Sequence, residues 1–106
     1  MTTATREQSL EALELGNRIR IRRASLKKAM KAGDVTLSQV MEQDKVWLYG
    51  MKVKDLVRAV PRMGESRVIH TQRALRIGDN VVLRDLTEVR REQLLIYLQR
   101  TFKVTV

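Results

Sequence analysis

The sequence has no cysteine, a single proline, five glycines and only 4% aromatic residues. Without cysteine there is neither a disulfide nor a thiolate metal site, which fits a reducing compartment. No apolar run approaches the ~20 residues that a membrane-spanning helix needs. The first fifteen residues also lack the apolar segment of a secretory signal. We therefore expect a cytoplasmic protein that does not span a membrane.

Positive charge, by contrast, is in excess. The 21 Lys and Arg residues outnumber the 12 Asp and Glu residues, which gives a formal charge of +9 and a pI near 10.7. Such a charge attracts polyanions, among which nucleic acid is the first candidate and an anionic membrane surface the second. The alternative is a soluble protein that is basic without a polyanionic partner. The length of 106 residues suits one small domain with one long appended element.

Every long segment has helical rather than alternating apolar periodicity, which predicts an all-α fold. The longest helix is expected over residues 3–32, with Gly33 directly after it. Gly16 weakens this helix by about 1 kcal/mol relative to alanine, and it is a natural boundary between an exposed leading segment and a packed one. The expected packed stripe consists of Leu15, Ile19, Leu26 and Met30. We accordingly divide the chain into a leading segment (1–15), a helical domain (16–101) and a tail (102–106).

Capping residues mark the starts of the remaining helices. Either Asp34 or Thr36 is expected to cap a short second helix, and Asp44 the turn that follows. Thr87 is expected to cap the last helix. Core anchors in these later segments are Val46, Trp47 and Leu48 in the short turn and Leu94, Leu95 and Leu98 in the last helix. The five-residue tail is either loose or docked on the core.

The most informative segment surrounds Pro61. Apolar residues at helical spacing precede it, and a second helical run follows and stops near Gly78. Pro61 must end the first of these helices, because proline lacks an N–H and crowds the preceding turn. Gly64 is expected to supply the free backbone that starts the second helix or lets another molecule come close. Since Arg62 and Arg67 flank the turn, its bare amides make a phosphate-binding arrangement.

The long first helix adds a second basic feature. Residues 16–31 hold seven basic side chains and no acidic one. Solvated helix faces usually mix both signs, and like charges one turn apart repel, so we interpret this helix as a surface for a polyanion. A membrane-surface helix would need its apolar groups exposed, whereas the core requires them here. The side chains expected on one face, away from the packed stripe, are Arg20, Arg23, Lys27 and Lys31.

Catalytic chemistry finds little support in the sequence. His70 has no cysteine, serine or metal-ligand partner at the spacing of a known motif. The carboxylates are scattered, and there is no phosphate-loop or dinucleotide fingerprint. We therefore expect neither an enzyme nor a bound metal or cofactor.

Four segments carry a resemblance to a known family: Arg18-Ile19-Arg20-Ile21-Arg22-Arg23-Ala24, Met51-Lys52-Val53, Val60-Pro61-Arg62-Met63-Gly64 and Leu83-Arg84-Asp85-Leu86. In their order and spacing the chain resembles the actinobacterial integration host factors over residues 15–98. The resemblance implies a long N-terminal helix packed on a compact helical domain with a helix–two-turn–helix motif. It leaves open whether the chain is encoded by a bacterial host, a phage or a plasmid.

The resemblance also implies a function. Family members bind duplex DNA mainly through its phosphates, bend or compact it within the nucleoid, and assist phage site-specific recombination. We therefore expect double-stranded DNA as the partner, a recombinase as a candidate second partner, and a monomer when the protein is free. The resemblance places DNA contacts at Arg62, Gly64, Arg67 and Arg84, and the basic helix extends them to Arg20, Arg23 and Lys27.

The chain departs from the family pattern at a few positions. Glu65 stands where the family often has a basic residue, and its carboxylate favours a helix start but repels phosphate. Val81 and Val82 replace a pair of arginines, and Asp85 replaces a glycine. We expect weaker phosphate binding at the turn and a stiffer or differently turned loop before the last helix.

Two other functions fit the same residues. Related helical turns occur in ribosomal proteins, so a structured RNA is an alternative ligand. The basic helix also suits an adaptor that docks on an acidic protein, which predicts poor DNA binding by the isolated chain. An enzyme built on this turn is the least favoured hypothesis, because the sequence shows no nucleophile or general acid.

Overall fold

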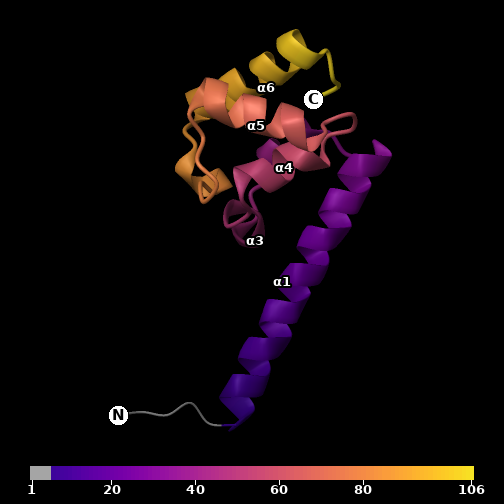
Figure 1. Ribbon diagram of the computed structural model, residues 1–106. Coiled ribbons are helices and arrows are strands. Elements are labelled where there is room, and N and C mark those ends of the chain that lie inside the picture. The colour runs from indigo at the N-terminus through magenta and orange to yellow at the C-terminus, as the bar shows by residue number, and fades with distance from the viewer. Residues whose placement is uncertain (1–5) are drawn as a thin grey trace.

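The computed structural model describes residues 6–106 as an all-α protein, with a long helix leaning against a compact bundle of shorter ones (Figure 1). This confirms the predicted fold class. Over the described residues, the only β-type pairing is an isolated bridge between Lys52 and Val82. The elements in chain order are α1 (Arg6–Ala32), α2 (Leu37–Glu42), α3 (Val46–Tyr49), α4 (Val53–Ala59), α5 (Glu65–Leu75), the 3₁₀ turn η1 (Leu83–Asp85) and α6 (Glu88–Phe102).

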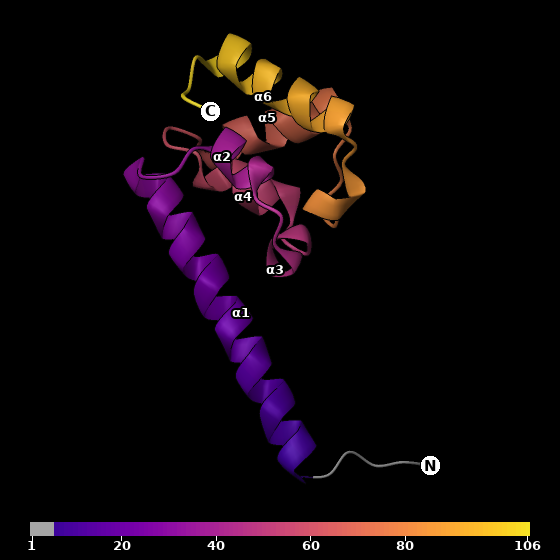
Figure 2. The same cartoon turned by 180° about the vertical axis from the view of Figure 1, so that it is seen from behind.

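Helix α1 touches the domain only through its C-terminal half. Leu26 and Met30 are buried in the core, and α1 contacts α3 and α4 there. The N-terminal half extends away from the bundle, as Figures 1 and 2 show from opposite sides. The prediction that Leu15 belongs to the packed stripe is therefore wrong, since its side chain is 58% exposed. Gly33 ends the helix as expected, with a φ of +81°. The expected start of the helix at residue 3 lies outside the described residues.

Thr36 rather than Asp34 caps α2. Its hydroxyl accepts the Gln39 amide at 3.2 Å, while the Gln39 side chain accepts the Thr36 amide at 3.0 Å. This reciprocal pair is a capping box, which satisfies two amides that the helix itself leaves free. Thr87 caps α6 as predicted, because its hydroxyl accepts the Arg90 amide at 3.2 Å.

Two predictions for the short helix α3 are wrong. Asp44 does not cap it: Lys45 is the N-cap residue, and the Asp44 carboxylate instead accepts a hydrogen bond from the Tyr49 hydroxyl. Val46 is not a core anchor, because it is 88% exposed while Leu48 is fully buried. Residues two apart lie on opposite sides of a helix, so a four-residue helix that buries Leu48 must turn Val46 outward.

Helix α4 lies at the centre of the bundle. Val53, Leu56, Val57 and Ala59 are all buried, and both α1 and α5 pack against this helix. Helix α6 closes the bundle over α5 and α2 through its buried Leu94 and Leu98.

The C-terminal tail is docked on the bundle. Val104 is buried, and the Val106 carbonyl accepts the Ser38 amide of α2 at 2.8 Å. The sequence left open whether the tail is loose or docked, and in the structure it is docked. The division of the chain at residue 15 stays a prediction, because α1 runs through that point without a break. No helix among the described residues is long and apolar enough to span a bilayer.

We expect Thr36→Ala to lower the free energy of unfolding by about 1 kcal/mol, because the substitution removes a helix cap. Urea denaturation followed by Trp47 fluorescence measures the change. Thr36→Ser, which keeps the hydroxyl, is the matched control and should stay close to the wild type. An equal loss in both variants would contradict the role of the hydroxyl.

Candidate nucleic-acid interface

The turn after α4 does not depend on Gly64 for a left-handed backbone conformation. Arg62, not Gly64, takes the left-handed conformation, with a φ of 69°. Gly64 has φ −82° and ψ 170°, which any residue adopts. A Cβ built on Gly64 meets no atom within 4 Å. The turn therefore does not need glycine for its own geometry, and what Gly64 provides is open space at the surface.

That open space lies directly before α5. The first amides of an α-helix have no acceptor within the helix, and they carry a partial positive charge. Gly64 is the N-cap residue and has no side chain to cap them. These exposed amides can bind an anion if no negative side chain nearby repels it.

The nearest negative charge, on Glu65, is neutralised within the chain. The Arg58 guanidinium binds both oxygens of Glu65, at 2.9 and 3.1 Å, and also the Asp55 carboxylate at 3.0 Å. The hydrogen bond that Arg58 donates to Glu65 raises the pKa of Arg58 above its ordinary value. Because this cluster is partly exposed, it adds little to stability. Its consequence is electrostatic: Glu65 repels an approaching phosphate less than the sequence suggested.

Arg67 is held at the same turn. Its Nη1 donates to the Arg62 carbonyl at 3.3 Å, and its guanidinium carbon lies 5.2 Å from the centre of the Phe102 ring. A cation over an aromatic ring is attracted to its face. Phe102 in turn packs edge-on against His70 and Tyr97. Arg67 thus remains exposed but has a preferred position beside the start of α5.

The basic part of α1 faces the domain and forms a crevice with it. Arg20, Arg23 and Lys27 line one side of a hollow of about 350 Å³, and Lys52 lies on the other. The expectation that Arg23 points away from the domain is wrong. Its Nε donates to the Trp47 carbonyl at 3.0 Å, and a Cβ at Gly50 would come within 2.7 Å of its guanidinium. Arg23 therefore packs α1 against α3.

Lys31 also joins α1 to the domain. Its Nζ donates to the Arg58 carbonyl at 2.8 Å, near the end of α4. Arg20 and Lys27 remain exposed along the crevice. Of the four basic residues assigned to one face of the helix, two thus hold the helix in place and two are free to meet a ligand.

Arg84 is positioned by a loop that is fastened to the start of α4. The Val53 amide donates to the Val81 carbonyl, and the Leu83 amide to the Met51 carbonyl, each at 2.9 Å. Asp85 closes the loop locally, because its carboxylate accepts the Val82 amide at 3.1 Å. That this loop is stiffer or differently turned than in the family stays a prediction. Arg84 itself is exposed.

The predicted residues thus fall into two groups at the two ends of α4. We call the first the crevice group: Arg20, Arg23 and Lys27, which line the crevice, and Arg84, whose loop is hydrogen-bonded to the start of α4. The second is the turn group: Arg62, Gly64 and Arg67, which follow its end. Lys52 belongs with the crevice group and was not among the predicted site residues, although it stands in one of the segments that carried the family resemblance.

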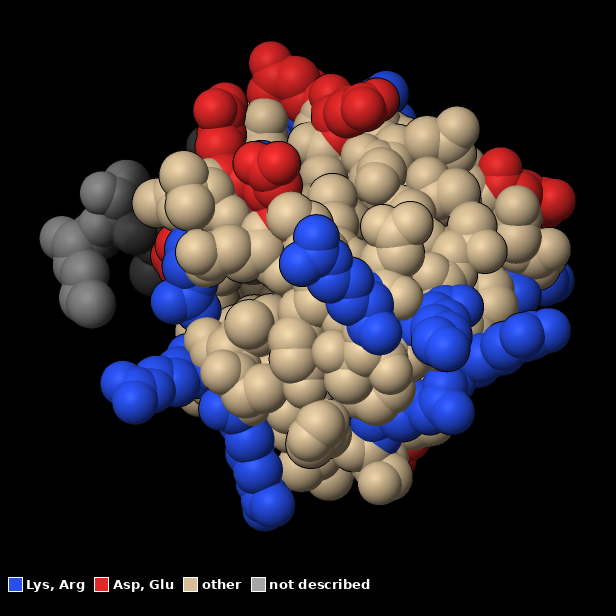
Figure 3. All heavy atoms as spheres, turned by 90° about the horizontal axis from the view of Figure 1, so that it is seen from above, with Lys and Arg blue, Asp and Glu red and all other residues tan. Residues whose placement is uncertain are grey.

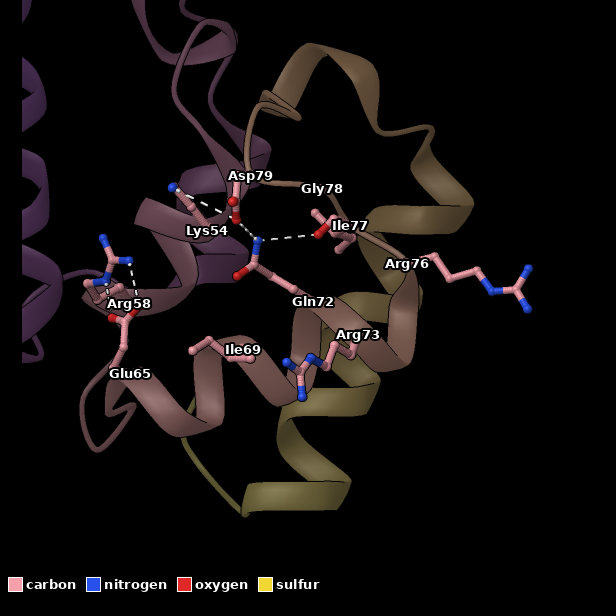
Figure 4. Close-up of a pocket in the computed structure, with 10 residues that line it drawn as sticks. All are labelled: Lys54, Arg58, Glu65, Ile69, Gln72, Arg73, Arg76, Ile77, Gly78 and Asp79. Carbon is pink, nitrogen blue, oxygen red and sulfur yellow. Dashed lines mark hydrogen bonds and ion pairs between the residues drawn. The ribbon is translucent and has the colours of Figure 1, made fainter.

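The surface separates its charges. On the face shown in Figure 3, acidic side chains gather along the upper edge, and lysine and arginine occupy the lower half. Sequence reasoning missed a further basic region: Arg73 and Arg76 border an open depression of about 600 Å³ beside α5 (Figure 4). Hydrogen bonding from Gln72 and the charge of Lys54 lower the pKa of Asp79 there. The i, i+3 spacing of Arg73 and Arg76 was the available signal.

Fold and site together define a small, basic helix–two-turn–helix protein with a long N-terminal helix. No family model matches the chain. It is 37% identical over 94 residues to the integration host factors of Mycobacterium tuberculosis and Mycolicibacterium smegmatis, which covers 86% of this chain and 89% of each relative. A solved structure of sIHF bound to an 8-bp palindromic DNA matches with a TM-score of 0.72 at 25% identity, over 84% of this chain and 98% of that one. The chain belongs to the actinobacterial integration host factor family.

Arg23→Ala should lower the free energy of unfolding by about 1 kcal/mol or more, because it leaves the Trp47 carbonyl without its charged donor. Arg20→Ala is the matched control: it removes the same charge from the same helix, and since Arg20 is exposed it should leave stability within about 0.5 kcal/mol of wild type. Urea denaturation of the two variants measures the difference. Equal stability of both would contradict the structural role of Arg23.

Proposed function

We propose that this chain is an architectural protein that binds duplex DNA, mainly through the phosphates and with little regard to sequence, and bends or compacts it. The observation that carries the proposal is the uncapped start of α5, open at Gly64 and flanked by Arg62 and Arg67. Bare helix amides next to arginines bind phosphate oxygens through both hydrogen bonds and charge. The structural neighbour bound to DNA supports the same ligand.

The crevice group extends the proposed footprint. Helix α4 has seven residues and is therefore about 10 Å long, comparable to the width of a DNA groove. Residues on its two ends can contact phosphates on either side of one groove. The bonds from Lys31 to Arg58 and from Val53 to Val81 hold the two ends in place. Such contacts position the protein on a duplex without reading bases.

The proposal places the protein with the nucleoid in the cytoplasm, where a site-specific recombinase is a candidate partner. It assigns no catalytic role to any residue. Structured RNA is the competing ligand, and competition between a duplex DNA and a structured RNA of equal length decides between them. Stronger competition by the RNA would overturn the proposal in favour of that alternative.

Gly64→Ala separates the ligand role of this glycine from its structural role. The backbone angles suit alanine and the space is empty, so the free energy of unfolding should change by at most about 1 kcal/mol. The added methyl group stands where a phosphate would approach the amides, so affinity for a random-sequence duplex should fall about tenfold or more. Fluorescence anisotropy measures the affinity. Unchanged affinity in the folded variant would remove the turn from the interface.

Salt dependence tests the phosphate contact of Arg67. Each phosphate contact contributes about −0.9 to the slope of log K against log[salt], so Arg67→Ala should make the slope shallower by about 1. Arg76→Asn removes an equal charge at the other end of α5, and asparagine tolerates the left-handed conformation of that residue. We expect a smaller change in slope for this control. Identical slopes for the wild type and Arg67→Ala would show that Arg67 contacts no phosphate.

A further inference from the structure

Helix α1 carries a second apolar stripe that the domain does not cover. Counting about 100° per residue, Leu10, Leu13, Ile21 and Ala24 lie on the side of the helix opposite to the buried Leu26 and Met30. The exposed fractions are 53% for Leu10, 67% for Leu13 and 64% for Ile21. With Asn17, these residues recur at intervals of three and four, which is the spacing of a helix seam that packs on another helix.

The stripe has no packing partner among the described residues. The N-terminal half of α1 extends beyond the bundle (Figures 1 and 2), and Leu10 and Leu13, which belong to it, are exposed. Helices that lack tertiary packing are marginal in water, because packing of an amphipathic face supplies most helical stability in proteins. Apolar contact along the stripe would supply the missing stabilisation.

The charges beside the stripe indicate what covers it. Residues 9–15 contain Glu11 and Glu14 and no basic residue, whereas residues 16–31 contain seven basic residues and no acidic one. A parallel copy of α1 would place cations opposite cations. An antiparallel copy places the acidic part of each helix opposite the basic part of the other. The charge pattern of α1 is therefore complementary to itself in one orientation only.

We propose that two copies of this chain associate through an antiparallel pairing of their α1 helices, centred on Asn17. In this register Leu10 faces Ala24 of the second copy and Leu13 faces Ile21. Glu14, which now pairs with Arg18 of its own helix at 3.8 Å, comes within reach of Arg18 of the second copy. That existing pair is exposed at both ends and therefore weak, so exchanging partners costs little.

The pairing is compatible with the rest of the molecule. Each domain packs on the opposite side of its own α1, through Leu26 and Met30, so the two domains lie outside the helix pair without colliding. The turn group and Arg23 lie away from the stripe, whereas Arg20 borders it on α1. A pair of this kind presents two sets of basic residues, one on each domain, and thus has the geometry to hold two duplex segments.

Cysteine cross-linking tests the orientation, and the absence of native cysteine makes each single substitution specific. Disulfides form only when the two Cα atoms lie within about 7 Å. We expect Asn17→Cys to form a disulfide dimer with itself, and Leu10→Cys to cross-link with Ala24→Cys when the two are mixed. Leu10→Cys alone and Ala24→Cys alone should not cross-link. Cross-linking of each variant with itself would indicate a parallel pair and overturn the proposal.

Sedimentation equilibrium tests the association itself. Since the contact is small, we expect the average mass of the wild type to rise above 12.3 kDa only toward concentrations of about 1 mM. Ile21→Asp should remain at the monomer mass. Val89→Asp is the matched control, because Val89 on α6 is also 64% exposed and the charge change is the same; it should behave as the wild type does. A wild type that stays monomeric, together with cysteine variants that give none of the expected cross-links, would overturn the proposal. Both experiments use the free protein, so their outcome is independent of DNA binding.

Discussion

The arrangement of this protein depends on the burial of α4. A helix of seven residues is too short to be stable on its own in water, so its neighbours must hold it. Val53, Leu56 and Val57 are covered by the surrounding helices, and main-chain and lysine hydrogen bonds fasten both of its ends. Because each end also carries one group of basic residues, the packing that stabilises α4 also fixes the separation of the two groups.

The two halves of α1 illustrate how one helix serves two purposes. Its C-terminal half is part of the core through Leu26 and Met30, and Arg23 and Lys31 add polar contacts to α3 and α4. Its N-terminal half is exposed, and the opposite apolar stripe begins there at Leu10 and continues to Ala24. The chain has a net charge of +9, but only some of its basic residues are available to a ligand.

Much of the fold could be predicted from the sequence because its signals are local. Apolar periodicity indicated the helices, Pro61 indicated the end of α4, and Thr36 and Thr87 indicated two caps. Each of these features depends on residues within one or two turns of itself. The family resemblance supplied the arrangement of the helices, which periodicity alone does not contain.

The predictions that were wrong concern where a segment meets the rest of the chain. Leu15 lies on the same face as Leu26, yet only Leu26 reaches the domain, because the bundle is shorter than α1. Arg23 looked like an exposed cation, but the carbonyl of Trp47 lies beside it. Gly64 was expected to supply the free backbone at the turn or to let another molecule come close, and it is Arg62 that adopts the left-handed conformation. Helical periodicity does not reveal which part of a face has a partner.

The central claim is that the residues at both ends of α4 meet one duplex together. The most direct test is a titration of ¹⁵N-labelled protein with a short random-sequence duplex, followed by amide chemical shifts. We expect the Glu65, Ser66 and Arg67 amides to shift together with those of Arg20, Lys52 and Arg84, and all of them to reach saturation at the same DNA concentration. The amide of Val89, on α6, should stay unchanged. Shifts confined to one end of α4, or different saturation points for the two groups, would contradict the claim.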